Sequence, residues 1–308
     1  MDGQMRRSGW LWVIATLICF QASDISLRIA SVDTHFAVGT VLQALPLMLI
    51  ALIVAVRRSL LSGDRIAGRS WGIIAGYGVL QFFTGNLLFY AAVQMGGLSI
   101  ASPSVQSQAI WAVVLGGVFL GERISRMMIY GILLFIAGLV TMAGFKSAGL
   151  SLSGDWIWAI VCGVLGGLAW AGGSALQRTQ LRRGVPLSYI LAIGSAAGIL
   201  LLNLMIILYY GTSAWQNTDL TGAVKVLAAG CFNGLAVASV SQALKTIEIS
   251  KVIPVISLSI VFNTLVGGLV FNEYLNAGSI VGMLVLFLGV IIVQEPKFRF
   301  LKSGGVRA

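Results

Sequence analysis

FLGERISRMMIYGILLFIAGLV at residues 119–140 is echoed by VFNEYLNAGSIVGMLVLFLGVII at residues 270–292. In each stretch a glutamate, Glu122 or Glu273, is followed by glycines 9 and 16 residues later. The remaining residues are mostly apolar, and glycines in such a setting let membrane helices approach each other closely. The echo therefore indicates two copies of one membrane-embedded unit.

The repeat extends along most of the chain. A shift of 150 residues places Phe20 and Arg28 on Trp170 and Arg178. We predict two domains, a first repeat at residues 1–147 and a second at residues 148–308 that ends in a short basic tail. Matched pairs at a shift of 151 are Ala92 with Ala243, Ser99 with Ser250, Pro103 with Pro254, Gly116 with Gly267, Gly117 with Gly268, Gly131 with Gly282, and Gly138 with Gly289.

Composition excludes a soluble domain. Of the 308 residues 58% are hydrophobic and 10% charged, whereas a soluble domain carries about a quarter charged residues. A helix needs about 20 mostly apolar residues to cross a bilayer. We therefore predict an all-α integral membrane protein with ten transmembrane helices, at residues 9–30, 36–56, 70–94, 98–120, 126–145, 155–177, 186–210, 222–244, 251–271 and 276–294.

Five predicted helices in each half make the two repeats inverted. An odd number of crossings brings the second repeat into the membrane from the opposite side, so a pseudo-two-fold axis in the membrane plane relates the halves. Such symmetry is typical of transporters, because two inverted copies can exchange conformations and open a central cavity to each side in turn.

The basic residues predict the orientation. All of the 20 except Arg28, Lys146 and Lys225 fall in loops or tails on the side of the N-terminus. Short loops rich in Lys and Arg stay in the cytoplasm. We therefore expect a multi-pass protein of the inner (cytoplasmic) membrane with both termini cytoplasmic. Short basic clusters between apolar runs also argue against nucleic acid as a partner.

The glutamate and glycine pattern of residues 119–140 and 270–292, with Phe20 eight positions before Arg28, resembles the EamA repeat of the drug/metabolite transporter (DMT) superfamily. Phe20 replaces the more usual tryptophan, and Asn272 replaces a common glycine. The resemblance implies a ten-helix fold whose central cavity is lined mainly by spans 1, 3, 4, 6, 8 and 9. It also implies export of amino acids or other metabolites, which is the activity of many members.

The first span carries an acidic side chain deep in the membrane. A charged side chain there costs about 2.5 to 3.5 kcal/mol on insertion scales, so it normally has a partner or faces a cavity. Arg28 lies one helical turn after Asp24, and Gln21 shares the same face. Two interpretations remain open: a polar stripe that binds substrate or takes up a coupling proton, or a neutralised pair that steadies the helix.

Uncharged polar residues from other spans complete the predicted site. Those on spans 3, 4, 8 and 9 recur at helical spacing, and their convergence predicts a binding site, although each could instead join helices by hydrogen bonds. Trp170 lies too deep for an interfacial belt and could stack on cargo or fill the core. The candidate substrate-binding residues are Gln21, Asp24, Arg28, Asn86, Tyr90, Gln108, Trp111, Trp170, Asn233, Ser241, Ser259 and Asn263.

These observations predict a secondary transporter that moves, and more specifically exports, a small polar metabolite such as an amino acid. Alternatives are another cargo class, such as a drug, nucleoside or sugar, and a membrane-embedded enzyme, for which the chain lacks a catalytic cluster. His35 and the three cysteines, Cys19, Cys162 and Cys231, have no paired spacing, so we expect no metal, cofactor or catalytic residues. The expected partners are the substrate and the lipid bilayer, and the sequence leaves monomer and homodimer open.

Overall fold

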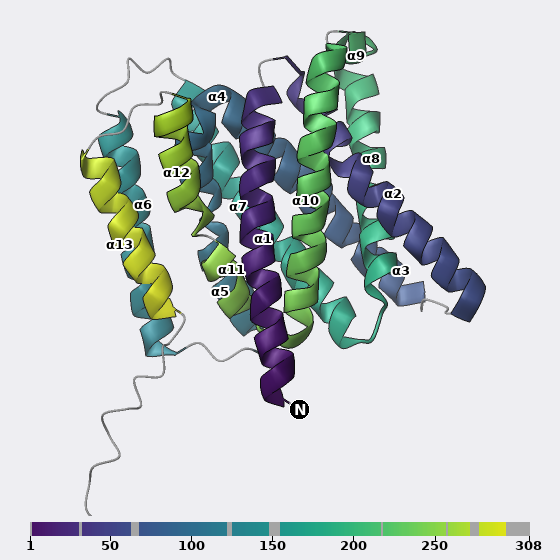
Figure 1. Ribbon diagram of the computed structural model, residues 1–308, viewed down its shortest axis with the longest axis horizontal. Coiled ribbons are helices and arrows are strands. Elements are labelled where there is room, and N and C mark those ends of the chain that lie inside the picture. Colours follow the sequence, from purple (N-terminus) through teal and green to yellow (C-terminus); the bar gives the residue numbers. More distant parts are fainter. Residues whose placement is uncertain are drawn as a thin grey trace, which may run out of the picture.

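The computed structural model describes residues 2–30, 33–62, 68–121, 125–147, 155–216, 218–256, 258–271 and 277–293. Glu122 and Glu273 lie outside them. The regular elements of the described part are all helical (Figure 1). They are α1 Asp2–Ala30, α2 Phe36–Ser62, α3 Gly68–Gly78, η1 Val79–Gly85, α4 Asn86–Val105, α5 Gln108–Leu120, α6 Arg126–Ser147, α7 Asp155–Arg182, α8 Leu187–Tyr209, α9 Ser213–Gln216, α10 Leu220–Thr246, α11 Ile249–Ile256, α12 Ser259–Val270 and α13 Ala277–Val293.

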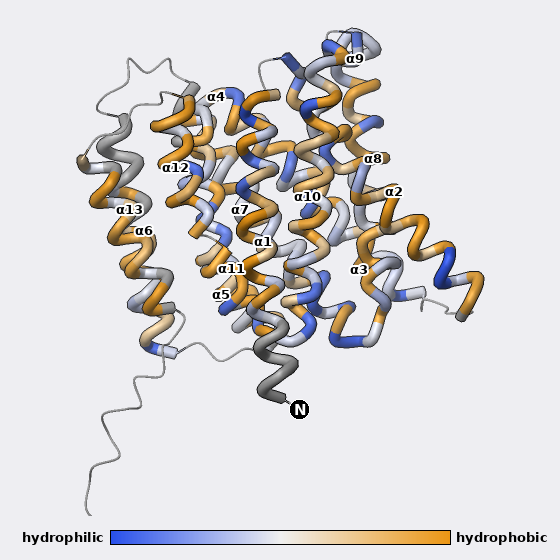
Figure 2. Tube along the Cα trace, in the orientation of Figure 1, coloured by the Kyte–Doolittle hydropathy of each residue, from blue (hydrophilic) through white to orange (hydrophobic). Residues whose placement is uncertain are grey.

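Six helical segments of the described part are long and apolar enough to cross a membrane. They cover residues 9–30, 36–61, 68–98, 157–182, 187–209 and 220–246. Shorter apolar helices lie at residues 126–138, 259–270 and 280–289. Figure 2 shows apolar residues along the outer faces of the bundle, and large side chains such as Leu11, Ile53 and Val118 are exposed there. A surface of this kind suits hydrocarbon, which offers no partners to polar groups.

Two of the predicted spans are each broken into two helices. The span at residues 98–120 changes from α4 to α5 just after Pro103, and the span at residues 251–271 changes from α11 to α12 just after Pro254. At both breaks the backbone makes hydrogen bonds between residues three apart, as in a 3₁₀ turn. Ala109 N–H donates to the Gln106 carbonyl, and Val261 N–H donates to the Leu258 carbonyl. Proline cannot donate a backbone hydrogen bond, which weakens a helix at this point.

The helix after each break begins at the same place in the two repeats. The restarting residues are Gln108 in α5 and Ser259 in α12, which are 151 residues apart, the shift that aligns the repeats. Both copies thus interrupt the equivalent helix at the equivalent residue. The interruption is a property of the repeated unit.

Helices α6 and α13 form a closely packed pair at one edge of the bundle (Figure 1). A Cβ atom added at Gly289 would lie 2.6 Å from the Phe135 backbone nitrogen, and one added at Gly138 would overlap the Leu286 backbone. These two glycines match in the repeat, and the structure confirms that they allow close approach of helices.

The other helices surround the centre of the bundle. Helix α1 packs along α10, α4 along α7, and α2 against α8. The N-terminus of α1 lies at the lower end of the bundle in Figure 1, close to the C-terminal end of α10, since Gly9 lies against Thr246 and Ile247. Arg178, near the C-terminal end of α7, donates to the Leu244 carbonyl at the same end. Helices α1 and α7, which match in the repeats, therefore run in opposite directions.

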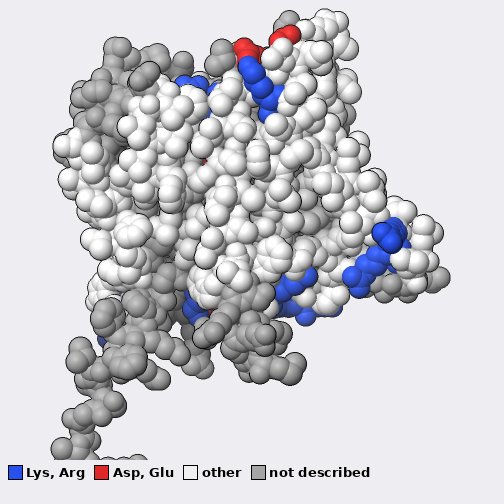
Figure 3. Space-filling model, viewed as in Figure 1, with Lys and Arg blue, Asp and Glu red and all other residues white. Residues whose placement is uncertain are grey.

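Charged side chains are found at the two ends of the bundle. Figure 3 shows lysine and arginine side chains gathered at the lower end, and a small group of acidic and basic side chains at the upper end. The broad middle of this face is free of both among the residues that Figure 3 colours. A band without charge between two charged ends is the pattern of a protein that crosses a bilayer.

Candidate substrate cavity

The cavity lies between the two broken helices, at the centre of the bundle. Its empty volume is about 760 Å³, counting the part open to solvent. Helices α1, α2, η1, α4, α5, α7, α10, α11 and α12 all contribute to its lining, so both repeats form the walls. The polar lining residues are Ser23, Asp24, Gln43, Gln81, Asn86, Ser102, Gln106, Gln108, Ser174, Asn233 and Ser259, and the aromatic ones are Phe20, Phe89 and Trp170.

Six of the residues predicted from the sequence line this cavity. Two more, Gln21 and Asn263, hydrogen-bond to residues that line it. The other four, Arg28, Tyr90, Trp111 and Ser241, lie away from the lining. The six lining residues are Asp24, Asn86, Gln108, Trp170, Asn233 and Ser259.

Asp24 is joined to the opposite repeat by an amide. Asn263 on α12 donates to Asp24 Oδ2 over 2.7 Å and to Ser102 Oγ over 2.8 Å. Asn263 is buried, with 1% of its surface exposed. The carboxylate of Asp24 thus bonds with a residue 239 positions away, whereas one of the two interpretations of the sequence paired it with Arg28.

The two helix breaks meet at a second group of polar side chains. Gln106, at the break between α4 and α5, donates to Ser259 Oγ over 2.8 Å. Gln108 donates to Gln106 Oε1 over 3.0 Å, and Gln21 on α1 donates to the Ser259 carbonyl over 3.2 Å. Residues of both repeats therefore make one hydrogen-bonded layer beside the cavity.

Trp170 forms an aromatic wall of the cavity from the middle of α7. Its indole Nε1 donates to Asn86 Oδ1 over 3.0 Å, and its ring centroid lies 5.2 Å from that of Phe89. A Cβ atom at Gly85 would overlap the Trp170 ring, so glycine is needed where η1 meets α4. Single-turn π-helical stretches such as η1 are often found at functional sites.

The cavity carries one charged side chain among the residues that the structure describes, and that residue is Asp24. The other polar groups of the lining are amides and hydroxyls, as at Gln43, whose Nε2 donates to Ser23 Oγ over 3.3 Å. A single carboxylate among neutral dipoles disfavours anionic cargo, because like charges repel strongly where water is scarce.

Tyr90 and Ser241 lie toward opposite ends of the bundle. The Tyr90 hydroxyl and the Thr34 hydroxyl are hydrogen-bonded over 2.6 Å near the upper end. Near the lower end, Gln177 donates to Ser241 Oγ over 2.8 Å. Tyr90 and Ser241 are 151 residues apart and so match in the repeat. Tyr90 thus bonds to the segment between α1 and α2, and Ser241 bonds to α7, each at its own end.

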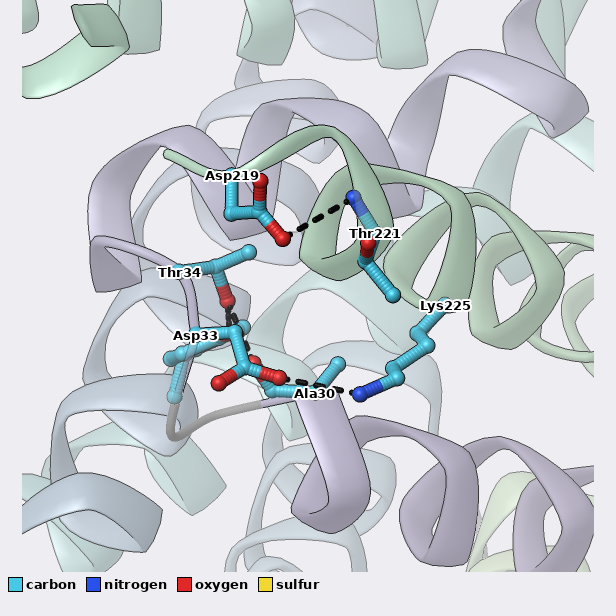
Figure 4. A network of polar contacts seen from close by, with 7 residues as sticks. Ala30, Asp33, Thr34, Asp219, Thr221 and Lys225 are labelled. Atoms are coloured by element: carbon cyan, nitrogen blue, oxygen red, sulfur yellow. Dashed lines mark hydrogen bonds and ion pairs between the residues drawn. The ribbon is translucent and has the colours of Figure 1, made fainter. Parts of the chain in front are cut away.

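The upper end is also held by an ion pair. Lys225 Nζ on α10 lies 2.9 Å from Asp33 Oδ2, while Asp219 accepts from the Thr221 backbone at the start of α10 (Figure 4). Asp33 and Lys225 each expose 38% of their side chains. Nearby, burial lowers the pKa of the His35 imidazole; this ring packs against the Phe36 and Tyr210 rings.

Arg28 and Trp111 have contacts outside the cavity. The Arg28 guanidinium carbon lies 5.8 Å from the centroid of the Phe271 ring. Trp111 packs against an apolar cluster that includes Val13 and Ala112. Trp111 therefore belongs to the packed core of the bundle.

Sequence spacing missed several lining residues, of which Gln106 is the clearest. On a continuous helix Gln106 lies on the face opposite to Ser104 and Gln108. The break at residues 106–107 redirects the chain, so Gln106 and Gln108 both line the cavity. The signal available in the sequence was Pro103 three residues earlier, since proline predicts an interruption.

Comparisons with known proteins agree with this architecture. The family model described as the EamA-like transporter family matches residues 7–144 and, a second time, residues 157–294. A solved structure titled "Crystal structure of protein" is similar in fold, with a TM-score of 0.70, 17% sequence identity, and coverage of 94% of this chain and 97% of the other. No curated protein matches in sequence. The chain is a multi-pass membrane protein that belongs to the EamA-like transporter family.

Proposed function

We propose that the protein is a secondary transporter that moves a small polar metabolite, such as an amino acid, across the cytoplasmic membrane by alternating access. The observation that carries the proposal is the polar cavity where the two broken helices meet, lined by both repeats. Transporters with inverted repeats bind substrate at this kind of place, near the middle of the membrane and beside discontinuous helices.

The proposed membrane arrangement has ten spans in two inverted groups of five. The part of α4 after its bend at Gly97 counts with α5 as one span, and α11 counts with α12 as another. The part of α4 before Gly97 continues α3 and η1, and α6 and α13 supply the remaining short spans. The gathering of basic side chains at the lower end supports a cytoplasmic location for that end. The proposal places both termini on the same side. Accessibility of tags fused to each terminus, in intact and in permeabilised cells, tests this orientation.

Contacts of two matched residues, one at each end of the bundle, support the alternation. Tyr90 bonds to Thr34 near the upper end, and Ser241 bonds to Gln177 near the lower end. The two residues are equivalent in the repeat, although their partners are not, and each helps to hold one end of the bundle together. In the proposed cycle each half adopts the conformation of the other in turn. Loosening the upper contact then opens the cavity outward, and loosening the lower contact opens it inward. Export is the proposed net direction.

Uptake into proteoliposomes tests the proposed function. Purified full-length protein should give saturable counterflow of one class among amino acids and related metabolites, measured with and without a pH gradient. Asn86→Leu should reduce counterflow severalfold, because it removes a lining amide and the acceptor for Trp170. Asn203→Leu is the matched control, since Asn203 donates to the Ile199 carbonyl of its own helix outside the cavity. Equal counterflow in protein-free liposomes would refute transport.

A further inference from the structure

Hydrogen-bond acceptors are in surplus around Asp24. Both amide protons of Asn263 are used, one by Asp24 and one by Ser102, and the Gln21 amide donates to the Ser259 carbonyl. Among the described residues, Asn263 Oδ1 and Gln21 Oε1 are buried without a hydrogen-bond partner. A buried acceptor without a donor is costly and is rarely left so without a reason.

The orientation of these two amides follows from their neighbours. Turning Asn263 over would bring its carbonyl oxygen against the Asp24 carboxylate, where two acceptors repel. Turning Gln21 over would likewise bring its carbonyl oxygen against the Ser259 carbonyl oxygen, which is also an acceptor. Amide orientation is assigned from the hydrogen bonds it must make, and here those bonds fix the amide nitrogens toward Asp24 and toward Ser259. Both carbonyl oxygens are then left without donors.

A positively charged donor would complete this group of acceptors. Asp24 is the charged residue of the lining among the described residues, and Arg28 is absent from the lining. Asp24 lines the cavity, its partner Asn263 and its neighbour Gln21 on α1 lie directly behind that lining, and the groups that these three residues leave without a donor are all acceptors. A primary ammonium group has three donors, no acceptor and one positive charge, so it matches this set in number and in sign.

The walls next to the acceptors suit an apolar or aromatic body. Phe20 lies one helical turn before Asp24 on α1 and lines the cavity, as do Phe89 and Trp170. Aromatic faces also attract cations when water is excluded. A bare metal cation would use the oxygens but leave these rings without contact.

We propose that Asp24, Asn263 and Gln21 form a subsite for the primary ammonium group of a substrate whose apolar or aromatic part lies against Phe20, Phe89 and Trp170. This inference rests on the proposed function, since it names the substrate class of the same cavity. An ammonium group occurs both in simple amines and in amino acids. The subsite recognises the group that they share.

Binding to the full-length protein in lipid nanodiscs, measured by calorimetry, tests the subsite. The probes are 2-phenylethylamine, phenylalanine, the neutral isostere 2-phenylethanol and sodium chloride alone. Either ammonium compound should bind at least about tenfold more tightly than the alcohol, as expected for a charged hydrogen-bonded pair out of water. The stronger of the two identifies the source as an amine or an amino acid. Equal affinity for the alcohol, or sodium binding that abolishes the preference for ammonium, would overturn the inference.

Substitutions test whether Asp24 confers the preference for ammonium compounds. Asp24→Asn should weaken 2-phenylethylamine binding about thirtyfold or more and leave 2-phenylethanol binding unchanged. Asp24→Glu, which keeps a carboxylate, should retain much of the affinity for 2-phenylethylamine. Asp219→Asn is the matched control, because Asp219 caps α10 outside the cavity. An unchanged ammonium preference in a folded Asp24→Asn protein would refute the assignment. If that variant does not fold, the wild-type comparison of amine with alcohol still decides.

The two proposals can fail separately. Ammonium binding without flux into proteoliposomes would keep the subsite and refute transport. Flux of a neutral or anionic metabolite with no ammonium preference would keep transport and refute the subsite.

Discussion

Gln106 and Ser259 join the two broken helices, with Gln106 Nε2 lying 2.8 Å from Ser259 Oγ. Both side chains are buried, and they come from opposite repeats. The contact therefore holds together the two interruptions that flank the cavity. Any motion that opens the cavity between α5 and α12 must strain or break this bond.

A double-mutant cycle measures this contact. Gln106→Ala and Ser259→Ala should each lower the free energy of unfolding in detergent, and the double variant should cost less than the sum of the singles. Side-chain hydrogen bonds in membrane proteins are worth about 0.6 kcal/mol on average and up to about 1.7 kcal/mol, so we expect a coupling energy in that range. Strict additivity would show that the two residues act independently.

Trp170 is expected to determine cargo preference. Trp170→Ala should change the ranking of cargoes in counterflow, because it removes a wall of the cavity and leaves Phe89 without its ring partner. Trp170→Phe should retain most of the ranking, since an aromatic face remains. Loss of thermal stability with an unchanged ranking would instead assign Trp170 to packing. Trp158, which is 63% exposed on the same helix, supplies the control substitution Trp158→Ala.

Substitution of the two matched residues, Tyr90 and Ser241, should have opposite effects on the two ends of the bundle. Tyr90→Phe removes the bond to Thr34 at the upper end, and Ser241→Ala removes the bond from Gln177 at the lower end. The first should favour the outward-open form and the second the inward-open form. Accessibility of a cavity cysteine to a thiol reagent applied from each side measures the balance. A shift in the same direction for both variants would contradict the exchange of conformations between repeats.

Close packing of α6 and α13 depends on matched glycines. Gly138→Ala should destabilise the protein by about 1 to 3 kcal/mol, the usual cost of overpacking, because the new Cβ would overlap the Leu286 backbone. Gly72→Ala, which meets nothing within 4 Å on α3, should be neutral or stabilising. Thermal unfolding in detergent provides the comparison. Equal melting temperatures for the Gly138 variant and wild type would mean that the helices can separate at no cost.

The apolar helices and the repeat could be predicted from the sequence, because both depend on local composition and on residue identity at a fixed shift. Close helix packing at the recurring glycines could also be predicted, but the sequence did not show that α6 and α13 would pack against each other. The ends of the helices at the breaks could not be predicted from the sequence, because hydropathy alone indicates one continuous span at residues 98–120. Pro103 and Pro254 were visible, but their consequence depends on the packing around them.

The partners of the polar residues were harder to predict. The spacing of Asp24 and Arg28 left two interpretations open, a polar stripe and a local pair, and neither included the bond that the Asp24 carboxylate makes with Asn263. Local periodicity cannot identify a partner from the opposite repeat, because that contact depends on how the repeats pack. The same limit applies to Tyr90 and Ser241, which were predicted to bind substrate and lie instead in contacts toward the two ends.

Labelling of Ser174→Cys in a background without Cys19, Cys162 and Cys231 tests the central claim most directly, because Ser174 lines the cavity. A membrane-impermeant thiol reagent should reach this cysteine from each face of oriented vesicles, and a transported substrate should slow labelling from both faces. Labelling from one face only, under all conditions, would contradict a cavity that opens to each side in turn.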